Sequence, residues 1–271
     1  MSLPHETRVR IPSTGDAFRP PLDERHGRYR LSFARGAREL ERVFRLRYDV
    51  FNLELGEGLR SCAESGLDRD RFDAQCHHLI VRDEPSDTVV GTYRLQVHAM
   101  ADAGEGFYSA GEFDLAPLTI VEACIELGRA CIAAEHRNRT VLFLLWRGLA
   151  AYARWNDKRY FFGCSSLTSQ DPDAGLALYD ELERDLLVHA SLRVEPLPHF
   201  ACIPRGASGS VRAPPIPTLF RTYLRYGARV LGMPALDREF GTVDFLTLLD
   251  LAALDPRTLE LFAAGLPRRS P

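Results

Sequence analysis

The order of apolar and polar residues along the chain predicts an alternation of helices and strands. Apolar residues recur with a period near 3.6, as on a helix with one buried face, in residues 38–52, 138–156, 173–187, 218–231 and 256–264. Strand-length apolar runs occupy residues 28–34, 76–82, 88–98, 121–132, 160–165 and 243–249, and residues 191–204 are predicted to be extended. Because helices and strands are mixed without a repeat, we predict one α/β domain.

The segments outside this pattern set the limits of the predicted domain. Residues 1–27 are rich in Pro, Arg and Asp and lack periodicity, which predicts a flexible or surface-draped lead before a domain at 28–264 and a tail at 265–271. Residues 54–75 are polar and charged and predict a long loop. Loops of that length inside compact domains are usually functional or disordered.

Composition excludes several classes of protein. The 271 residues are 45% hydrophobic and 26% charged, as in ordinary globular domains, and the net charge of −3 gives no overall nucleic-acid footprint. No apolar run reaches the ~18 residues that a membrane span needs, and the N-terminus lacks the apolar region of a secretory signal. We therefore expect a cytoplasmic protein. Only Lys158 is a lysine among 34 basic residues, so an arginine is informative only through its position.

The six cysteines predict free thiols. They are scattered without a C-x-x-C pair, and disulfides are rare in the cytosol. Cys76-His77-His78 resembles a metal-binding corner, but neighbouring residues on a strand point to opposite faces. We predict no metal and no tightly bound cofactor.

Charged residues occur inside the apolar elements. Arg47 lies in the apolar face of a helix, where it either extends to solvent or is buried against acids. Asp68, Asp70 and Asp73 crowd the loop before the strand at residue 76 and offer such acids. Arg94 lies in a half-apolar strand.

Glu126 and Arg129 lie together in another apolar strand. Three residues apart on a regular strand, they would point to opposite faces, whereas a β-bulge near Gly128 would turn both toward one cavity. Charges of both signs inside core elements indicate an ionic network that lines a polar pocket. A purely structural network is the alternative.

This strand runs into a short polar turn and an amphipathic helix. Such a turn binds phosphate groups through free backbone N–H groups, but Arg137, Arg139 and Thr140 occur here in place of glycines. On the helix, Arg139, Arg147 and Arg154 fall within an arc of ~80° at 100° per residue. This basic stripe is either a steering surface for an acidic partner or an ordinary solvated face.

Four motifs resemble, in order and spacing, the pattern of acyl-homoserine-lactone synthases, which belong to the GNAT-like N-acyltransferase superfamily. They are Arg47-x3-Phe51, Asp70-x2-Asp73, Gly91-x2-Arg94-Leu95 and Glu126-x2-Arg129. The wider text, including RLRYDVFNLELGEG, VVGTYRL and ELGRACI, is more similar to the L-ornithine Nα-acyltransferases, which use 3-hydroxyacyl chains on acyl carrier protein. The resemblance covers residues 28–262. It implies a mixed, mostly antiparallel central sheet with helices on both faces.

The chain departs from these families at two places. Glu57 stands where the homoserine-lactone synthases carry a tryptophan, which fits a different amine acceptor. Thr140 and Leu142 replace the glycines that let the GNAT loop approach the coenzyme A pyrophosphate. The resemblance therefore favours an acyl-phosphopantetheine thioester on acyl carrier protein as co-substrate, with coenzyme A as the alternative. The predicted contacts to the carrier and its pantetheine are Arg137, Arg139, Thr140 and Arg147.

Amide formation from a thioester needs an unprotonated amine, a polarised carbonyl and a protonated leaving thiol. We expect Glu126 to receive the proton of the amine through water, with Asp70 and Asp73 orienting the amine. Arg94 and Arg129 would hold these acids or bind the carboxylate of the acceptor.

The remaining predicted roles lie around this centre. Arg47 and Phe51 are expected to close the pocket, and backbone N–H groups at 130–132 to bind the thioester oxygen if the bulge exists. Tyr179 resembles the tyrosine that GNAT enzymes use as general acid, and ordinary packing on an amphipathic helix is its alternative.

The expected function is transfer of a fatty, 3-hydroxy acyl group from acyl carrier protein to the α-amine of ornithine, the first step of ornithine lipid synthesis. One alternative is a synthase of N-acyl amino acids or homoserine-lactone-like signals. A second is a non-catalytic GNAT-like module that binds acyl carrier protein. Because the product would be a membrane lipid, we expect transient contact with the inner membrane. The net charge gives no reason to expect binding to nucleic acid.

Overall fold

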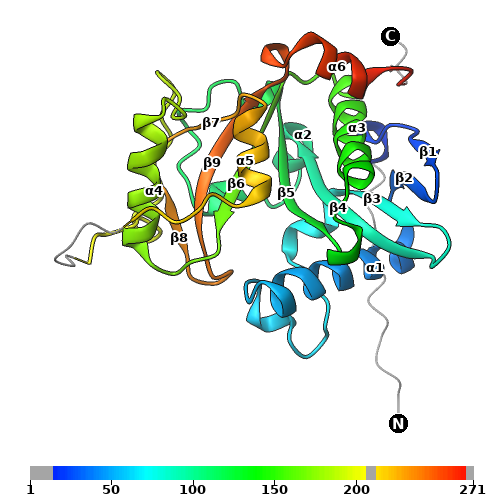
Figure 1. Cartoon of the computed structure of the whole chain (residues 1–271), viewed down its shortest axis with the longest axis horizontal. Coiled ribbons are helices and arrows are strands. Elements are labelled where there is room, and N and C mark those ends of the chain that lie inside the picture. The colour runs from blue at the N-terminus through cyan, green and yellow to red at the C-terminus, as the bar shows by residue number, and fades with distance from the viewer. Residues whose placement is uncertain (1–14, 206–211, 267–271) are drawn as a thin grey trace.

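The computed structural model describes residues 15–205 and 212–266, which are built around one nine-stranded sheet (Figure 1). The strands follow the order β1-β2-β3-β4-β5-β6-β9-β7, and β8 also pairs with β9. Their bounds are β1 Asp23–His26, β2 Tyr29–Phe33, β3 His77–Asp83, β4 Thr88–Val97, β5 Cys124–Ile132, β6 Tyr160–Leu167, β7 Arg229–Val230, β8 Ala235–Asp237 and β9 Thr242–Asp250. The predicted mixed sheet is confirmed.

Strands β5 and β6 form the one parallel pair of this sheet, and they separate soon after they meet. Their register holds only from Cys124 opposite Tyr160 to Glu126 opposite Phe162. Gly163 follows at the point of separation, where a Cβ atom would lie 2.2 Å from the carbonyl oxygen of Leu127. Only glycine fits so close to a neighbouring strand. The split leaves the edge of β5 beyond Glu126 without a partner strand on the β6 side, in the described part of the chain.

Helices cover both faces of the sheet, as predicted. Their bounds are α1 Gly36–Tyr48, α2 His98–Asp102, α3 Arg139–Trp155, α4 Pro172–Arg184, α5 Thr218–Arg225 and α6 Pro256–Ala263. Helix α1 packs through Val43 against the face of the sheet that carries Ile80, and α3 packs through Leu145 against the opposite face with Leu79. In Figure 1, α5 lies in front of the gap between β5 and β6.

Local signals explain where the main helices begin. The side chain of Asn138 caps α3 by accepting a hydrogen bond from the backbone N–H of Val141 at 3.0 Å. Asp171 caps α4 in the same way, and Pro172 occupies its first turn. Helix α1 continues through a π-helical segment, Asp49–Glu54, which carries Phe51 toward the sheet.

The largest differences from the sequence prediction concern three segments. Residues 23–26, assigned to the lead, form strand β1, which pairs with β2 as a hairpin. The helix predicted at 218–231 ends at Arg225, because Gly227 turns the chain with φ +94° and leads into β7. Residues 191–204 form isolated bridges and no regular strand. The lead at 1–14 and the tail at 267–271 lie outside the described residues.

In the described ranges, no helix is both long and apolar enough to cross a membrane.

Candidate active site

A cavity of about 260 Å³ lies where β5 and β6 separate. One wall is β5 from Glu126 to Ala130, and β6 from Phe161 to Ser166 forms another. Helix α5 contributes Phe220 and Tyr223. Phe51 reaches the cavity from the extension of α1, as predicted, and its ring packs edge-on against Phe240 at 5.5 Å between centroids. The cavity therefore combines apolar surface with the polar edge of a split sheet.

Arg47 is fully buried beside this cavity and does not extend to solvent. Its Nε donates to Asp68 Oδ1 at 2.7 Å, and its Nη1 donates to Asp73 Oδ1 at 2.7 Å. Burial alone would raise the pKa of Asp73, but the charges of Arg47 and Arg94 outweigh it and hold that pKa well below its usual range. Of the two predictions for Arg47, the buried ion pair is confirmed.

Two further arginines complete the group. Arg94 Nη1 lies 2.6 Å from Asp70 Oδ1 and 3.1 Å from Asp73 Oδ1. Arg129 lies 3.0 Å from Asp70 and 3.4 Å from Asp68. We call these three arginines and three aspartates the Arg–Asp network. Its charges are balanced, and Asp70 and Asp73 also accept backbone N–H bonds as a capping box of residues 71–74.

The predicted β-bulge exists and is centred one residue beyond Gly128. Thr92 pairs with Cys131 and Arg94 with Gly128, so β5 has one extra residue here. Arg129 takes up the bulge with φ +47°, a conformation that side chains other than glycine seldom adopt. Its guanidinium lies 4.2 Å from the ring centroid of Phe240. The bulge brings Arg129 and Glu126 to the same cavity, as predicted.

Glu126 is held by three donors. Gln96 Nε2 and the backbone N–H of Tyr108 donate to its Oε2 at 2.6 and 3.0 Å, and the backbone N–H of Ser109 donates to its Oε1 at 2.7 Å. A carboxylate has about four acceptor positions, so one remains open. Glu126 therefore fixes the segment 108–109 on β5 and still lines the cavity.

A second group of titratable side chains contains only acids, of which Glu57 and Asp244 line the cavity and the other two lie beside Asp244. We call Glu57, Glu112, Asp237 and Asp244 the acidic cluster; each is at least nine-tenths buried. Among the described residues none of the four forms an ion pair with a basic side chain. Burial, reinforced by neighbouring acids, raises the pKa of Asp244 to about 6 and holds the pKa of Glu112 well above its usual range. Burial also raises the pKa of Glu57.

The sequence prediction missed three members of this cluster. Glu57 had been noted only as a departure from a tryptophan. Asp244 stands in an apolar strand, the same signal that marked Arg94, and could have been found in that way. Glu112 and Asp237 lie in short or irregular segments, where no periodicity marks a buried charge.

Tyr179 is not among the residues that line the cavity. It packs on α4 with Leu178 and Leu182 in a separate apolar cluster over β9, and only 7% of it is exposed. Packing, the alternative given for this residue, is therefore what the structure shows. The prediction placed Tyr179 at the site because helical position alone does not determine which neighbour a side chain faces.

The predicted carrier contacts separate into two groups. The guanidinium of Arg147 binds both carboxylate oxygens of Glu24 on β1 and donates to the carbonyl of Phe262 at 3.3 Å. Arg154 likewise donates to the carbonyl of Ala263 at 3.1 Å. These two arginines connect the terminal elements to α3, so the prediction that Arg147 contacts the carrier is corrected.

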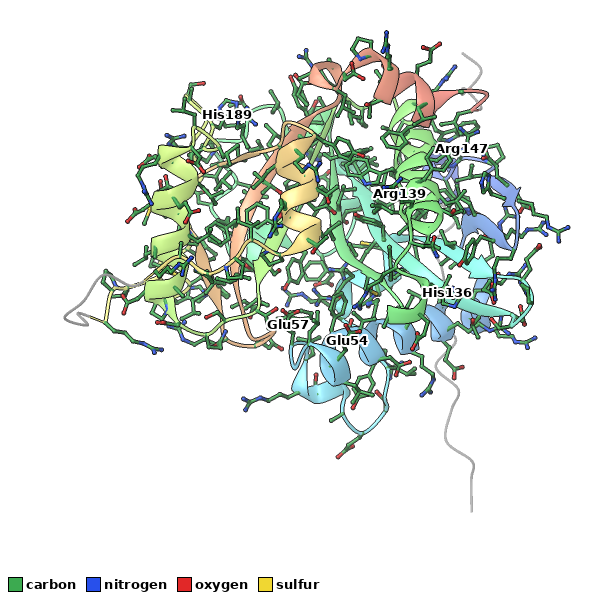
Figure 2. The ribbon with its side chains drawn as sticks, in the orientation of Figure 1. Glu54, Glu57, His136, Arg139, Arg147 and His189 are labelled. Carbon is green, nitrogen blue, oxygen red and sulfur yellow. The ribbon has the colours of Figure 1, made fainter. Side chains whose placement is uncertain are left out.

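The turn before α3 stays near the surface. Arg137 pairs with Glu54 at 2.5 Å, Arg139 is exposed, and Thr140 is half-buried. In Figure 2, Glu54 and Glu57 lie together at the end of the extended α1, whereas Arg147 lies along α3 on the other side of the molecule.

The sequence of this chain is similar to those of known proteins. Residues 46–147 match the acetyltransferase (GNAT) domain family. The mixed sheet, its split β5–β6 pair and this match define an acyltransferase of GNAT type. The L-ornithine N(alpha)-acyltransferase of Brucella abortus is 31% identical over 266 residues, which cover 93% of this chain and 94% of that protein. The enzyme of the same name from Agrobacterium fabrum is 31% identical over 90% of this chain and 88% of its own. The chain belongs to the L-ornithine N(alpha)-acyltransferase family.

Solved structures are similar at lower identity. The homoserine-lactone synthase LasI aligns with a TM-score of 0.47 at 12% identity, covering 90% of this chain and 98% of its own. FeeM, an N-acyl amino acid synthase from uncultured soil microbes, aligns with a TM-score of 0.47 at 9% identity, covering 82% and 92%.

Proposed function

We propose that this chain moves a fatty acyl group, as the 3-hydroxy derivative, from a thioester to the α-amine of ornithine, the first step of ornithine lipid synthesis. The observation that carries this proposal is the cavity between β5 and β6, which joins an apolar wall to buried carboxylates. The apolar wall suits an acyl chain, and the carboxylates suit an amino acid with two amines. The names of the relatives support ornithine as the acceptor.

The donor in this proposal is acyl-phosphopantetheine on acyl carrier protein. The open edge of β5 past Glu126 offers backbone N–H and C=O groups to the amides of a pantetheine arm. Thr140 and Leu142 in place of glycines disfavour the pyrophosphate of coenzyme A. Exposed Arg139, beside this turn, is proposed to contact the acidic carrier, with Thr140 and the Glu54-paired Arg137 facing the pantetheine phosphate.

The proposed base is Glu126. An α-amine is mostly protonated near neutral pH, so a carboxylate must take its proton before attack. The one open acceptor position of Glu126 can hold a water that relays this proton. Arg94 and Arg129 hold Asp70 through ion pairs, and we propose that they shape the pocket and bind the carboxylate of the acceptor at its edge.

The leaving thiolate needs a proton, and we propose that Tyr223 and Tyr93 supply it in place of Tyr179. Both line the cavity, and their hydroxyl oxygens lie 2.6 Å apart. Burial raises the pKa of both hydroxyls, so both keep their protons at neutral pH. One tyrosine would give its hydroxyl proton to the thiolate, the hydrogen bond from the other would stabilise the phenolate that remains, and the proton that Glu126 takes from the amine would return to this phenolate through water.

The product would be amphiphilic, and we propose a transient contact with the inner membrane at the mouth of the cavity. Leu53 is 67% exposed and Leu55 is 41% exposed, and Leu55 also lines the cavity. Exposed apolar side chains beside an opening suit lipid transfer to a bilayer surface.

The test is a reaction with purified protein, 3-hydroxyacyl carrier protein and ornithine. We expect release of free thiol and formation of N-acylornithine, which mass spectrometry identifies. The same acyl chain on coenzyme A serves as the matched donor and should react at least about tenfold more slowly. Absence of thiol release with every amino acid would refute the enzymatic function, whereas equal rates with both donors would refute only the choice of carrier.

A further inference from the structure

In the described part of the chain, no basic side chain balances the acidic cluster, although the cluster lies within the protein. Buried carboxylates are normally paired, because an uncompensated charge in a poorly solvated site is costly. The Arg–Asp network nearby obeys this rule with three charges of each sign. As far as the described residues show, the network is therefore complete, whereas the acidic cluster lacks a positive group.

Asp244 shows where that group would bind. It is 2% exposed, it lines the cavity, and its Oδ1 has no hydrogen-bond partner among the described residues. Ligand atoms of Asp244, Glu112 and Cys164 lie within 4.8 Å of one another. Glu57 reaches the same cavity and accepts a hydrogen bond from Thr168. An open carboxylate oxygen in a cavity wall, with further acceptors around it, fits a small cation with several N–H donors.

We propose that the acidic cluster binds the side-chain ammonium of a diamino acid acceptor and thereby selects ornithine over amino acids with uncharged side chains. The inference rests on the proposed function. It assigns specificity to Asp244 and Glu112, with Glu57 and Asp237 completing the set of oxygen acceptors.

One short segment connects this site to the proposed base. The backbone N–H groups of Tyr108 and Ser109 donate to Glu126, and the hydroxyl of Tyr108 donates to Asp237 at 3.2 Å. Glu112 follows in the same segment. An acceptor whose side-chain ammonium sits at the acidic cluster is thus oriented with its α-amine toward Glu126, because both anchors are fixed on one piece of chain.

The ammonium accounts for the position of the cluster better than a metal ion does. Among the described residues, Cys164 is the soft ligand that lies within 4.8 Å of both Asp244 and Glu112, and burial raises the pKa of its thiol well above the usual range, so it is not a ready thiolate. An ammonium instead needs only oxygen acceptors, of which the cluster has several.

The experiment compares ornithine with norvaline, which has the same carbon skeleton and no side-chain amine. For the wild-type protein, kcat/KM should favour ornithine by about a hundredfold or more, as expected for a buried charge pair. In Asp244→Asn and in Glu112→Gln, the ornithine-to-norvaline ratio should fall at least about tenfold. Asp250→Asn, on the same strand but paired with Arg159 at the surface, is the matched control and should keep the wild-type ratio.

Other outcomes overturn the inference. Equal losses for both acceptors would make the two acids structural, and an unchanged ratio would remove them from the acceptor site. A preference that a chelator abolishes and added Zn²⁺ restores would make the cluster a metal site.

A binding measurement keeps the inference separate from the proposed function. Ornithine, and not norvaline, should raise the melting temperature of the wild-type protein, and the rise should vanish in Asp244→Asn. If the wild type acylates neither amino acid yet shows this pattern, the proposed reaction is wrong and the ammonium site stands. If ornithine produces no rise in a protein that acylates ornithine and norvaline equally, the ammonium site is wrong.

Discussion

The Arg–Asp network and the acidic cluster lie beside the same cavity, and they differ in charge balance. In the network, every aspartate contacts at least one arginine within 3.1 Å. In the cluster, Glu57, Glu112 and Asp237 each interact with Asp244, and none of the four acids has such a partner in the described chain. A balanced group satisfies itself and supports the fold, whereas we propose that the acidic cluster is completed by a cation that enters the cavity.

This difference reassigns the roles that the family resemblance implied. Asp70 and Asp73 were predicted to orient the amine, but their oxygens are committed to arginines and to backbone N–H groups. We therefore propose that the network holds the bulged strand in position, and that the side-chain ammonium of the acceptor is recognised by acids that the four motifs do not contain.

The strongest test of the network is the loss of its central arginine. Arg47→Met leaves Asp68 and Asp73 buried and without their partner, and should lower the free energy of unfolding by ~3–5 kcal/mol. Chemical denaturation measures this. Arg42→Met removes a surface pair with Asp87 and should cost less than ~1 kcal/mol. Similar small losses in both variants would contradict a structural role for the network.

The second test concerns Glu126, which lies between the two groups. Glu126→Gln should reduce turnover by roughly 10²–10⁴-fold, the usual contribution of a general base. Its amide also faces three donors, so circular dichroism and the melting temperature must first show that the variant folds. A folded variant with full activity would remove Glu126 from the proposed chemistry.

The third test concerns the acidic cluster, where the pKa of a carboxyl is raised and not lowered as it is in the Arg–Asp network. The pKa of Asp244 is raised to about 6 in the folded protein, from 3.8 in the unfolded chain, so the folded state holds this proton more tightly. Stability should therefore fall as pH rises from about 4 to about 7. Asp244→Asn removes this cost and should stabilise the protein by on the order of 1–3 kcal/mol at pH 7.5, with little gain at pH 4.

Thermal unfolding at the two pH values measures that effect, with Asp250→Asn as control. Arg159 lowers the pKa of Asp250, so its replacement should never stabilise. Destabilisation of Asp244→Asn at pH 7.5 would mean that the cluster is already compensated.

The smallest expected effect concerns the surface. Arg139→Glu should raise the KM for acyl carrier protein a few-fold, more at low salt, because exposed charges mainly affect encounter with a charged partner. Arg184→Glu on α4 changes the protein's charge equally at an unrelated surface. If both variants behave alike, the effect comes from net charge and the proposed carrier contact is wrong.

Periodicity along the chain determined most of the elements, the buried state of several charges and the need for a bulge between Glu126 and Arg129. These are local properties, since a helix or strand repeats over a few residues and a charge in an apolar stripe is visible where it stands. The resemblance to known acyltransferase families added the class of reaction. The same signal in strand β9 would have revealed Asp244.

Tertiary structure decided which charges meet. Arg47 pairs with an acid 21 residues away, and Arg129 pairs with one 59 residues away. Arg147 pairs with Glu24, whereas the sequence predicted that it contacts a carrier protein. Periodicity tells whether a side chain faces inward, but its partner depends on which strands lie side by side. For that reason the sequence predicted a charged pocket, and only the fold separated its balanced half from the half that has no basic partner among the described residues.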